Sequence, residues 1–185
     1  MNVEELLSRY RAGKRNFQQI DLSQVILVNT DLPQIDLSQA KLSEADLTGT
    51  NFEEAVFYQA NLDLSNLSQA RLAGANFTLA SIKSALLYKA NLSKARLKKA
   101  NLSRTILQRA FLREANLQAA ILENANLKQV NLIDADLQQA NLERADLSNA
   151  FLQGANLFQA CLDNANLDRA VLTGATMPDG KVFAK

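Results

Sequence analysis

The sequence predicts an all-β fold, a solenoid in which short extended sides alternate with corners around a column of buried leucine. Three observations predict it. From Phe17 to Met177 every fifth residue is apolar, in 33 positions that hold 27 Leu, four Phe, one Ile and one Met. The residue two places earlier is Ala in 24 of the 33 units, and the residue between them is Asn or Asp in 19. The repeating unit is therefore A-(N/D)-L-x-x, and its step never slips.

The five-residue step excludes a helical fold. An α-helix turns by about 100° per residue, so residues five apart would scatter around its surface and leave no apolar stripe. The heptad spacing of a coiled coil does not fit either. In an extended backbone, residues two apart point the same way, so the Ala and Leu of one unit face inward together and the Asn or Asp faces outward. The two remaining residues then turn the chain into the next unit.

The unit A-(N/D)-L-x-x resembles the pentapeptide-repeat family over about 165 of the 185 residues. The resemblance implies a right-handed quadrilateral parallel β-helix with four units, about 20 residues, per coil and about eight coils in all. The opening MNVEELLSRYRAGKRNFQQIDL and the late MPDG are similar to cyanobacterial members of the family. One such member acts by binding a transcriptional regulator, so the resemblance implies a protein partner without identifying it.

The two ends of the repeat carry different signals. Residues 1–14 are expected to form an N-terminal capping helix, residues 15–179 the β-helix, and residues 180–185 a C-terminal tail. Apolar residues with helical spacing precede Gly13, at Val3, Leu6, Leu7 and Tyr10. At the other end, Met-Pro-Asp-Gly is a turn signal that stops the coil. Each coil of a solenoid contacts only its neighbours, so both ends need a cover.

The composition argues against an enzyme. The chain has no His, the commonest general base and metal ligand, and one Cys, Cys161, which excludes an internal disulfide and a thiolate metal cluster. It has no glycine-rich phosphate loop, and acids such as Asp36 occupy the Asn/Asp place of the repeat, where a role in the turn is sufficient. We therefore expect no catalysis, no cofactor and no metal site.

The sequence also carries no signal for export or for membrane insertion. Glu4 and Glu5 stand where a secretion signal needs a basic end, and no stretch approaches the roughly 18 apolar residues of a membrane span. A single cysteine fits a reducing compartment. These features predict a cytoplasmic protein with no membrane span.

Charge is distributed in bands along the chain. From Leu64 to Arg113 there is no Asp or Glu but ten Lys or Arg, whereas acids predominate on either side. With four sides per coil, these residues would circle the rod as a belt, with Arg96, Lys98 and Lys99 as its densest point. The belt is a candidate interaction surface; the alternative is that it only keeps the surface soluble. Its candidate residues are Lys89, Lys94, Arg96, Lys98, Lys99, Arg104, Arg109 and Arg113.

Apolar residues replace the outward Asn or Asp in nine units. In a four-sided coil, Phe111, Phe151 and Val171 share one side, and Phe151 and Val171 are direct neighbours. Exposed apolar clusters often mark contact surfaces, which makes these three residues a second candidate surface. The alternative is that a sheet face simply tolerates aromatic and β-branched residues. The nine residues are Ile26, Val56, Leu86, Ile106, Phe111, Ile121, Phe151, Cys161 and Val171.

These features favour a non-catalytic protein–protein interaction scaffold, regulatory through binding a cellular protein that the sequence does not identify. The family also includes quinolone-resistance-type members, which mimic DNA and engage type II topoisomerases. That alternative is disfavoured here, since a mimic needs a continuous anionic face and residues 64–113 interrupt it. Binding of nucleic acid is also disfavoured, because a belt circles the rod instead of lining one face. The expected assembly is a monomer or an end-to-end dimer.

Overall fold

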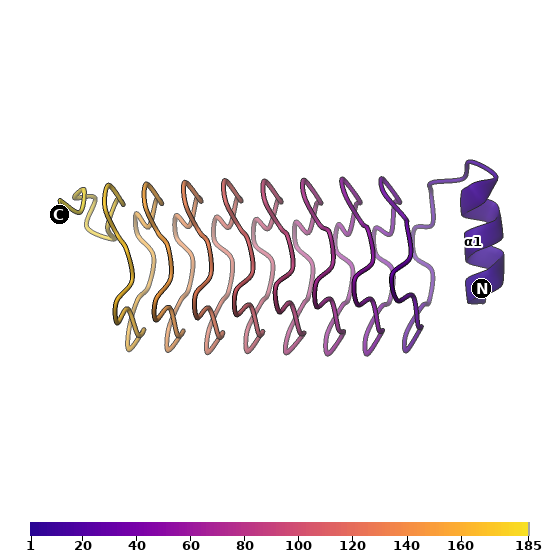
Figure 1. Cartoon of the computed structure of the whole chain (residues 1–185), viewed down its shortest axis with the longest axis horizontal. Coiled ribbons are helices and arrows are strands. Elements are labelled where there is room, and N and C mark those ends of the chain that lie inside the picture. The colour runs from indigo at the N-terminus through magenta and orange to yellow at the C-terminus, as the bar shows by residue number, and fades with distance from the viewer. Residues whose placement is uncertain (185) are drawn as a thin grey trace.

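The computed structural model describes residues 1–184 of the chain. One helix, α1 (Val3–Arg11), lies at one end of a straight rod, and the C-terminal residues lie at the other (Figure 1). The side chain of Asn2 caps α1 by accepting a hydrogen bond from the N–H of Glu5 at 2.8 Å. The expected N-terminal helix is thus present. It is the only helix among the described residues, and it is neither long nor apolar enough to cross a membrane.

The rod is a four-sided coil with a period of 20 residues. Each residue in the Asn/Asp position forms a parallel bridge with the residue 20 places later, from Asn16↔Asp36 to Asn156↔Thr176, which amounts to eight coils. We number the sides in chain order. Residues 16–20 lie on the first side, 21–25 on the second, 26–30 on the third and 31–35 on the fourth, and each side recurs every 20 residues.

The sides are shorter than strands. Within residues 1–184 the ladder consists of isolated bridges, one residue per side, and not of the extended parallel strands expected from the sequence. The reason is that the turn takes up most of each unit. The N–H of Ala40 donates to the carbonyl of Leu37 at 3.0 Å, and the corner residue Gln39 has a φ of 59°. This is the pattern of a type II turn, which requires a positive φ at its second central residue.

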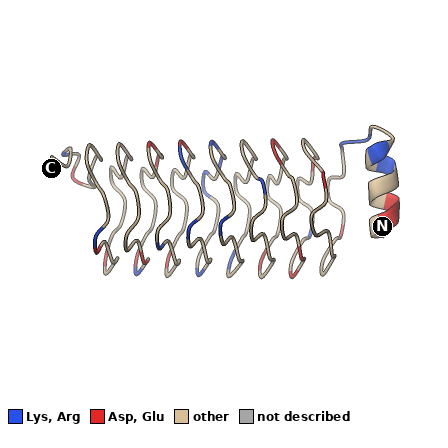
Figure 2. Cartoon of the chain, in the orientation of Figure 1, with Lys and Arg blue, Asp and Glu red and all other residues tan. Residues whose placement is uncertain are grey.

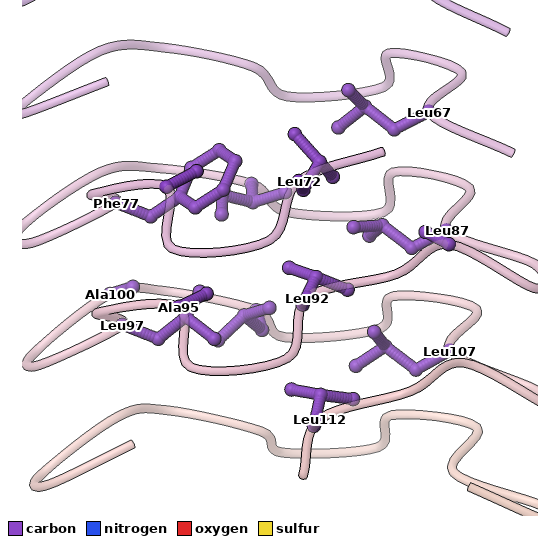
Figure 3. Close-up of a cluster of buried hydrophobic side chains, with 14 of the residues drawn as sticks. Leu67, Leu72, Phe77, Leu87, Leu92, Ala95, Leu97, Ala100, Leu107 and Leu112 are labelled. Atoms are coloured by element: carbon purple, nitrogen blue, oxygen red, sulfur yellow. The ribbon is translucent and has the colours of Figure 1, made fainter. Parts of the chain in front are cut away.

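The Leu and Ala positions form the interior, as expected. Leu97 and Ala95 are fully buried in the column of side chains that runs along the rod axis (Figure 3). Phe57 and Phe77 lie in one column and stack with their ring centroids 4.7 Å apart. A buried side chain of this size contributes roughly 1.5–3 kcal/mol in transfer free energy, repeated at each step of the coil.

The two ends of the core are covered differently. At the N-terminal end Leu6 of α1 is fully buried, and the hydroxyl of Tyr10 donates a hydrogen bond to the carbonyl of Pro33 at 2.7 Å. At the C-terminal end Val182 forms an antiparallel bridge with Thr176. The leucines of the last coil, such as Leu172, stay only partly buried, so this end of the core is covered less completely.

Candidate interaction surface

The outward Asn and Asp side chains are occupied with the backbone. In 18 of the 19 units that carry one, its Oδ1 accepts a hydrogen bond from the N–H two residues later, as between Asn91 and Ser93 at 3.1 Å. The bond fixes the turn that leads into the corner. These side chains therefore have a structural role, as the sequence suggested for the acids among them.

Asp31 is the one exception, and its neighbour explains it. Two residues later stands Pro33, which has no N–H to donate. The Asp31 carboxylate instead accepts hydrogen bonds from Nδ2 of Asn51 at 3.1 Å and from Nη2 of Arg71 at 3.0 Å. An acid without a turn to cap thus pairs with a cation from a neighbouring part of the rod.

The basic belt is neutralised where it meets the acidic bands. The Nζ of Lys94 lies 3.7 Å from a carboxylate oxygen of Glu114, one 20-residue period later in the chain. The Nε of Arg113 lies 3.3 Å from a carboxylate oxygen of Glu114, and its Nη2 lies 3.5 Å from a carboxylate oxygen of Asp134. Because each coil stacks on residues 20 positions away, the borders of a basic stretch fall beside acids that are remote in sequence. Lys94 and Arg113, both expected in the belt, therefore have their charge balanced inside the chain.

Six belt residues have no acid partner among residues 1–184. In contrast, the nine other Lys and Arg residues between positions 16 and 184 each lie 3.9 Å or less from a carboxylate oxygen. We call the six the free cations. All six are exposed in the middle coils, where Figure 2 shows basic segments on more than one side. They are Lys89, Arg96, Lys98, Lys99, Arg104 and Arg109.

Five of the six free cations gather on two of the four sides. Arg96, Lys98 and Lys99 stand together on the first side, as expected, and this side has no acid between Asp36 and Asp136. Arg104 stands alone at a corner of the second side. The remaining two free cations lie on the third side, one coil apart. The belt therefore becomes two basic surfaces and a single arginine.

The third side combines its two cations with an aromatic ring. The Lys89 ammonium lies 5.2 Å from the centroid of the Tyr88 ring, and Nε of Arg109 donates to the side-chain oxygen of Gln129 at 2.7 Å. Desolvation alone would raise the pKa of Tyr88, but hydrogen bonding and charge from Arg109 and Lys89 outweigh it and lower that pKa below its usual value. Tyr88 was not among the candidates from the sequence, although its place beside Lys89 was visible there.

The apolar candidates are only partly brought together. Phe151 and Val171 form a parallel bridge on the fourth side, and their side chains are 43% and 36% exposed. Phe111 is on the same side and 48% exposed, but Asn131 lies between it and Phe151. The patch is therefore a pair, with Phe111 apart from it.

The remaining surface features are a thiol and a hollow. Cys161 is half-buried on the second side. Across residues 1–184, no three His, Cys, Asp or Glu side chains come together as metal ligands would. A hollow of about 520 Å³ lies beside α1 and is lined by residues of mixed charge, among them Arg11, Arg15 and Asp31. The free cations and the apolar pair of Phe151 and Val171 are thus what the structure leaves of the two surfaces that the sequence suggested.

Comparison with known proteins places the repeat in a recognised group. The model of the family described as pentapeptide repeats matches in eight copies, over residues 16–53, 40–78, 50–87, 110–149 and 150–179. None of these ranges includes residues 88–109, where the structure nevertheless continues the same coil. The free cations all lie in that interval, in which the buried Ala and Leu positions also continue.

Solved structures share the repeat along most of the chain. HetL, a pentapeptide repeat protein involved in heterocyst differentiation regulation from the cyanobacterium Nostoc sp. strain PCC 7120, is 35% identical, with 99% of this chain and 100% of that chain covered and a TM-score of 0.47. QnrB1, a plasmid-mediated fluoroquinolone resistance protein, is 18% identical in its full-length form, with 92% and 89% covered and a TM-score of 0.52. That second likeness supports the right-handed quadrilateral β-helix and nothing further. No curated protein matches the chain.

Proposed function

The chain belongs to the pentapeptide-repeat family, and from that premise we propose that it is a non-catalytic scaffold that binds an acidic surface of a protein partner and regulates the partner by covering that surface. The six free cations carry this proposal. The rest of the coil balances its basic residues within the chain, whereas these six leave their charge available to another molecule.

The architecture suits recognition without rearrangement. Each side of the rod is held to the next coil by backbone hydrogen bonds, such as that from the N–H of Leu97 to the carbonyl of Asn116 at 2.7 Å. Side chains on such a surface keep a fixed spacing, so binding requires little ordering of the backbone. Arg96, Lys98 and Lys99 present three cations from one five-residue unit, the densest group of free charge. We assign the main contact to this unit.

Two observations support a non-catalytic role. The sequence contains no His, and the Asp and Asn side chains in the Asn/Asp position of the repeat, such as Asp36 and Asp136, cap turns. A protein of this kind acts on its partner by occupancy alone, which is the basis of the regulatory role. DNA mimicry is disfavoured, because the free cations interrupt three of the four sides and paired basic residues such as Arg71 and Lys94 interrupt the acids of the fourth.

The test is a pull-down from a lysate of the native cell, with the protein immobilised. We expect a partner that is captured by the unmodified protein and released as salt rises from about 0.1 M to about 1 M, where the Debye length falls from about 10 Å to about 3 Å. The variant Arg96→Glu/Lys98→Glu should lose it. The matched control Arg144→Glu/Arg169→Glu reverses two charges that already have acid neighbours and should retain it. A partner captured equally by all three proteins would refute the assignment.

A further inference from the structure

The third side lacks its turn caps in two successive coils. Leu86 and Ile106 occupy the Asn/Asp position, form a parallel bridge with each other and are 39% and 37% exposed. In the described coil, Phe151 and Val171 on the fourth side are the other place where adjacent coils both lack the cap. Leu86 and Ile106 thus form a short aliphatic surface where the repeat normally places polar side chains.

The missing caps leave two backbone donors free. In capped units the N–H two residues after the Asn or Asp is bonded to its side chain. The corresponding N–H groups here belong to Tyr88 and Gln108, and neither donates a hydrogen bond to any atom within residues 1–184. They lie one coil apart, about 4.8 Å along the rod. Both face the place that a carboxamide or carboxylate oxygen fills in the other units.

Two free cations flank the same surface. Lys89 and Arg109 are the corner residues of the two uncapped units. On this side the nearest carboxylates, Asp46 and Asp146, each lie two coils away, and Asp146 is already paired with Lys128 at 3.1 Å. The fourth-side pair, Phe151 and Val171, has glycine at both of its corners, Gly154 and Gly174. Free donors, positive charge and aliphatic surface therefore coincide on the third side.

We propose that Leu86, Tyr88, Lys89, Ile106 and Arg109 form a docking site for an acidic segment of a partner protein. The segment places carboxylates on the two cations and the two unpaired N–H groups, and an apolar side chain between them on Leu86 and Ile106. This inference rests on the proposed function and adds to it a second surface, on the third side, with its own partner chemistry. A carboxylate can accept both from backbone N–H groups and from Lys or Arg.

A peptide explains this surface better than a nucleic acid does. Nucleic-acid surfaces place several aromatic rings for base stacking along a basic groove. Here there is a single ring, that of Tyr88, which is half-buried and covered by the ammonium of the next residue, Lys89. The exposed apolar side chains of this surface, Leu86 and Ile106, are aliphatic. An aliphatic pair between cations fits a segment in which Leu- or Ile-like side chains alternate with Asp or Glu.

The test uses two short fluorescein-labelled peptides, one of alternating Glu and Leu and one of alternating Gln and Leu, with binding followed by fluorescence anisotropy. We expect the Glu peptide to bind at least about tenfold more tightly than the Gln peptide, because its contacts are charge-assisted. In NMR spectra of the ¹⁵N-labelled protein, the amide signals of Tyr88 and Gln108 should shift on addition of the Glu peptide.

The decisive variant is Leu86→Asn/Ile106→Asn, which restores the residue typical of the repeat at both places. It should fold at least as well as the unmodified protein, yet bind the Glu peptide at least about tenfold more weakly, because the new side chains occupy both N–H groups. The matched control Phe151→Asn/Val171→Asn makes the same kind of change on the fourth side and should leave binding unchanged. Lys89→Gln/Arg109→Gln should weaken binding as the double Asn variant does.

Three outcomes would overturn the site: equal binding of both peptides, no effect of the Asn replacements, or binding of a mixed-sequence single-stranded oligonucleotide in place of the Glu peptide. These outcomes are separable from failure of the proposed function. If the site fails while a lysate partner is still lost with Arg96→Glu/Lys98→Glu, the scaffold role stands and only this docking site is rejected.

Discussion

At the scale of single residues, the corner of each unit is the position where the backbone adopts a conformation that a side chain disfavours. Twenty-eight corner residues other than glycine have φ between 51° and 62°, a region that costs an L-residue about 1 kcal/mol or more. Hydrogen bonds hold them there. The N–H of Lys99 donates to the carbonyl of Gln118 on the next coil, and the N–H of Ala100 closes the turn onto Leu97. One hydrogen bond thus holds the corner to the next coil and another holds it within its own turn, so the corner can be occupied by polar residues of many kinds.

Substitutions at two corners isolate this backbone cost. Gly74 has a φ of +69°, and a Cβ built there would meet only Cγ of Glu54, at an ordinary 3.5 Å. We expect Gly74→Ala to lower the free energy of unfolding by about 1 kcal/mol, since the cost lies in the backbone alone. Ala119→Gly, at a corner with φ 54°, should leave stability unchanged or raise it. Thermal and urea unfolding measure both. Equal losses in the two variants would contradict this account of the corners.

The acids in the Asn/Asp position make stability depend on pH. Burial opposes ionisation of Asp36, but hydrogen bonds from Ser38 and from the Gln18 amide outweigh it and hold the pKa of that carboxyl below its ordinary value. A carboxyl with a lowered folded-state pKa stabilises the fold above its unfolded-state pKa, about 3.9 for Asp. That contribution is lost as the pH falls through the folded-state value.

Replacement of Asp36 by asparagine tests this pH dependence. Asp36→Asn keeps an Oδ1 to accept the N–H of Ser38, as Asn does elsewhere in the repeat, but removes the titrating group. We expect a lower unfolding free energy for the variant at pH 7, where it lacks the contribution of the carboxylate, and a shallower decline below about pH 4, so that the two curves converge. Urea unfolding at a series of pH values gives the two curves. Parallel curves down to about pH 2 would show that this carboxyl does not contribute to acid sensitivity.

At the scale of the structural element, one coil is a closed layer of four Leu-position and four Ala-position side chains. The sequence predicts this layer well, because the inward positions depend only on local spacing and recur without a slip. It predicts the strands less well, since nothing in the spacing shows that the turn leaves a single bridging residue per side. The helix α1, which covers the N-terminal end of the rod, could also be predicted from the helical spacing of its apolar residues.

The cost of a core cavity should depend on the coil in which it is made. Leu97 is fully buried between coils, so Leu97→Ala should cost roughly 2.7–5 kcal/mol, the range for leucine sites that cannot collapse. Leu172 lies in the last coil and is only partly buried, so the same truncation there should cost clearly less. Chemical denaturation of both variants provides the comparison. Equal costs would mean that the C-terminal end is covered as completely as the middle.

The candidate surface was predictable only in part. The basic residues could be found from the sequence, but their neutralisation depends on contacts one and two coils away, such as Lys94 with Glu114 and Arg71 with Asp31. The burial of Tyr88 and its interactions with Lys89 and Arg109 could not be predicted from the sequence, because they depend on how the side chains are arranged in space. The stacking of Leu86 on Ile106, however, follows from the period of 20 and could have been read by writing the chain in rows of that length.

At the scale of the whole molecule, the interior and the surface obey different rules. Most units have the same inward Ala and Leu on all four sides, so the core is largely indifferent to which side a unit occupies. The surface is not, because a side chain there meets residues one or two coils away and residues of adjoining units, as Lys94 meets Glu114 and Arg71 meets Asp31. The position of a residue around the rod is therefore set by the number of units before it, and an added or lost unit rotates everything after it onto another side.

Deletion of a single unit separates fold from surface. Deletion of residues 101–105 moves Ile106 from the third side to the second, away from Leu86. Residues 116–120 follow both Leu86 and Ile106 in the chain, so their deletion leaves the two residues stacked. Each deletion removes one unit with one buried core leucine, Leu102 or Leu117. We expect both proteins to give the far-ultraviolet spectrum of the parent and melting temperatures within about 4 °C of each other, equivalent to about 1 kcal/mol. Only the first should lose binding of the Glu–Leu peptide. If both deletions unfolded the rod, the sides would not be equivalent; if both retained binding, the stacked pair on the third side would not be the docking site.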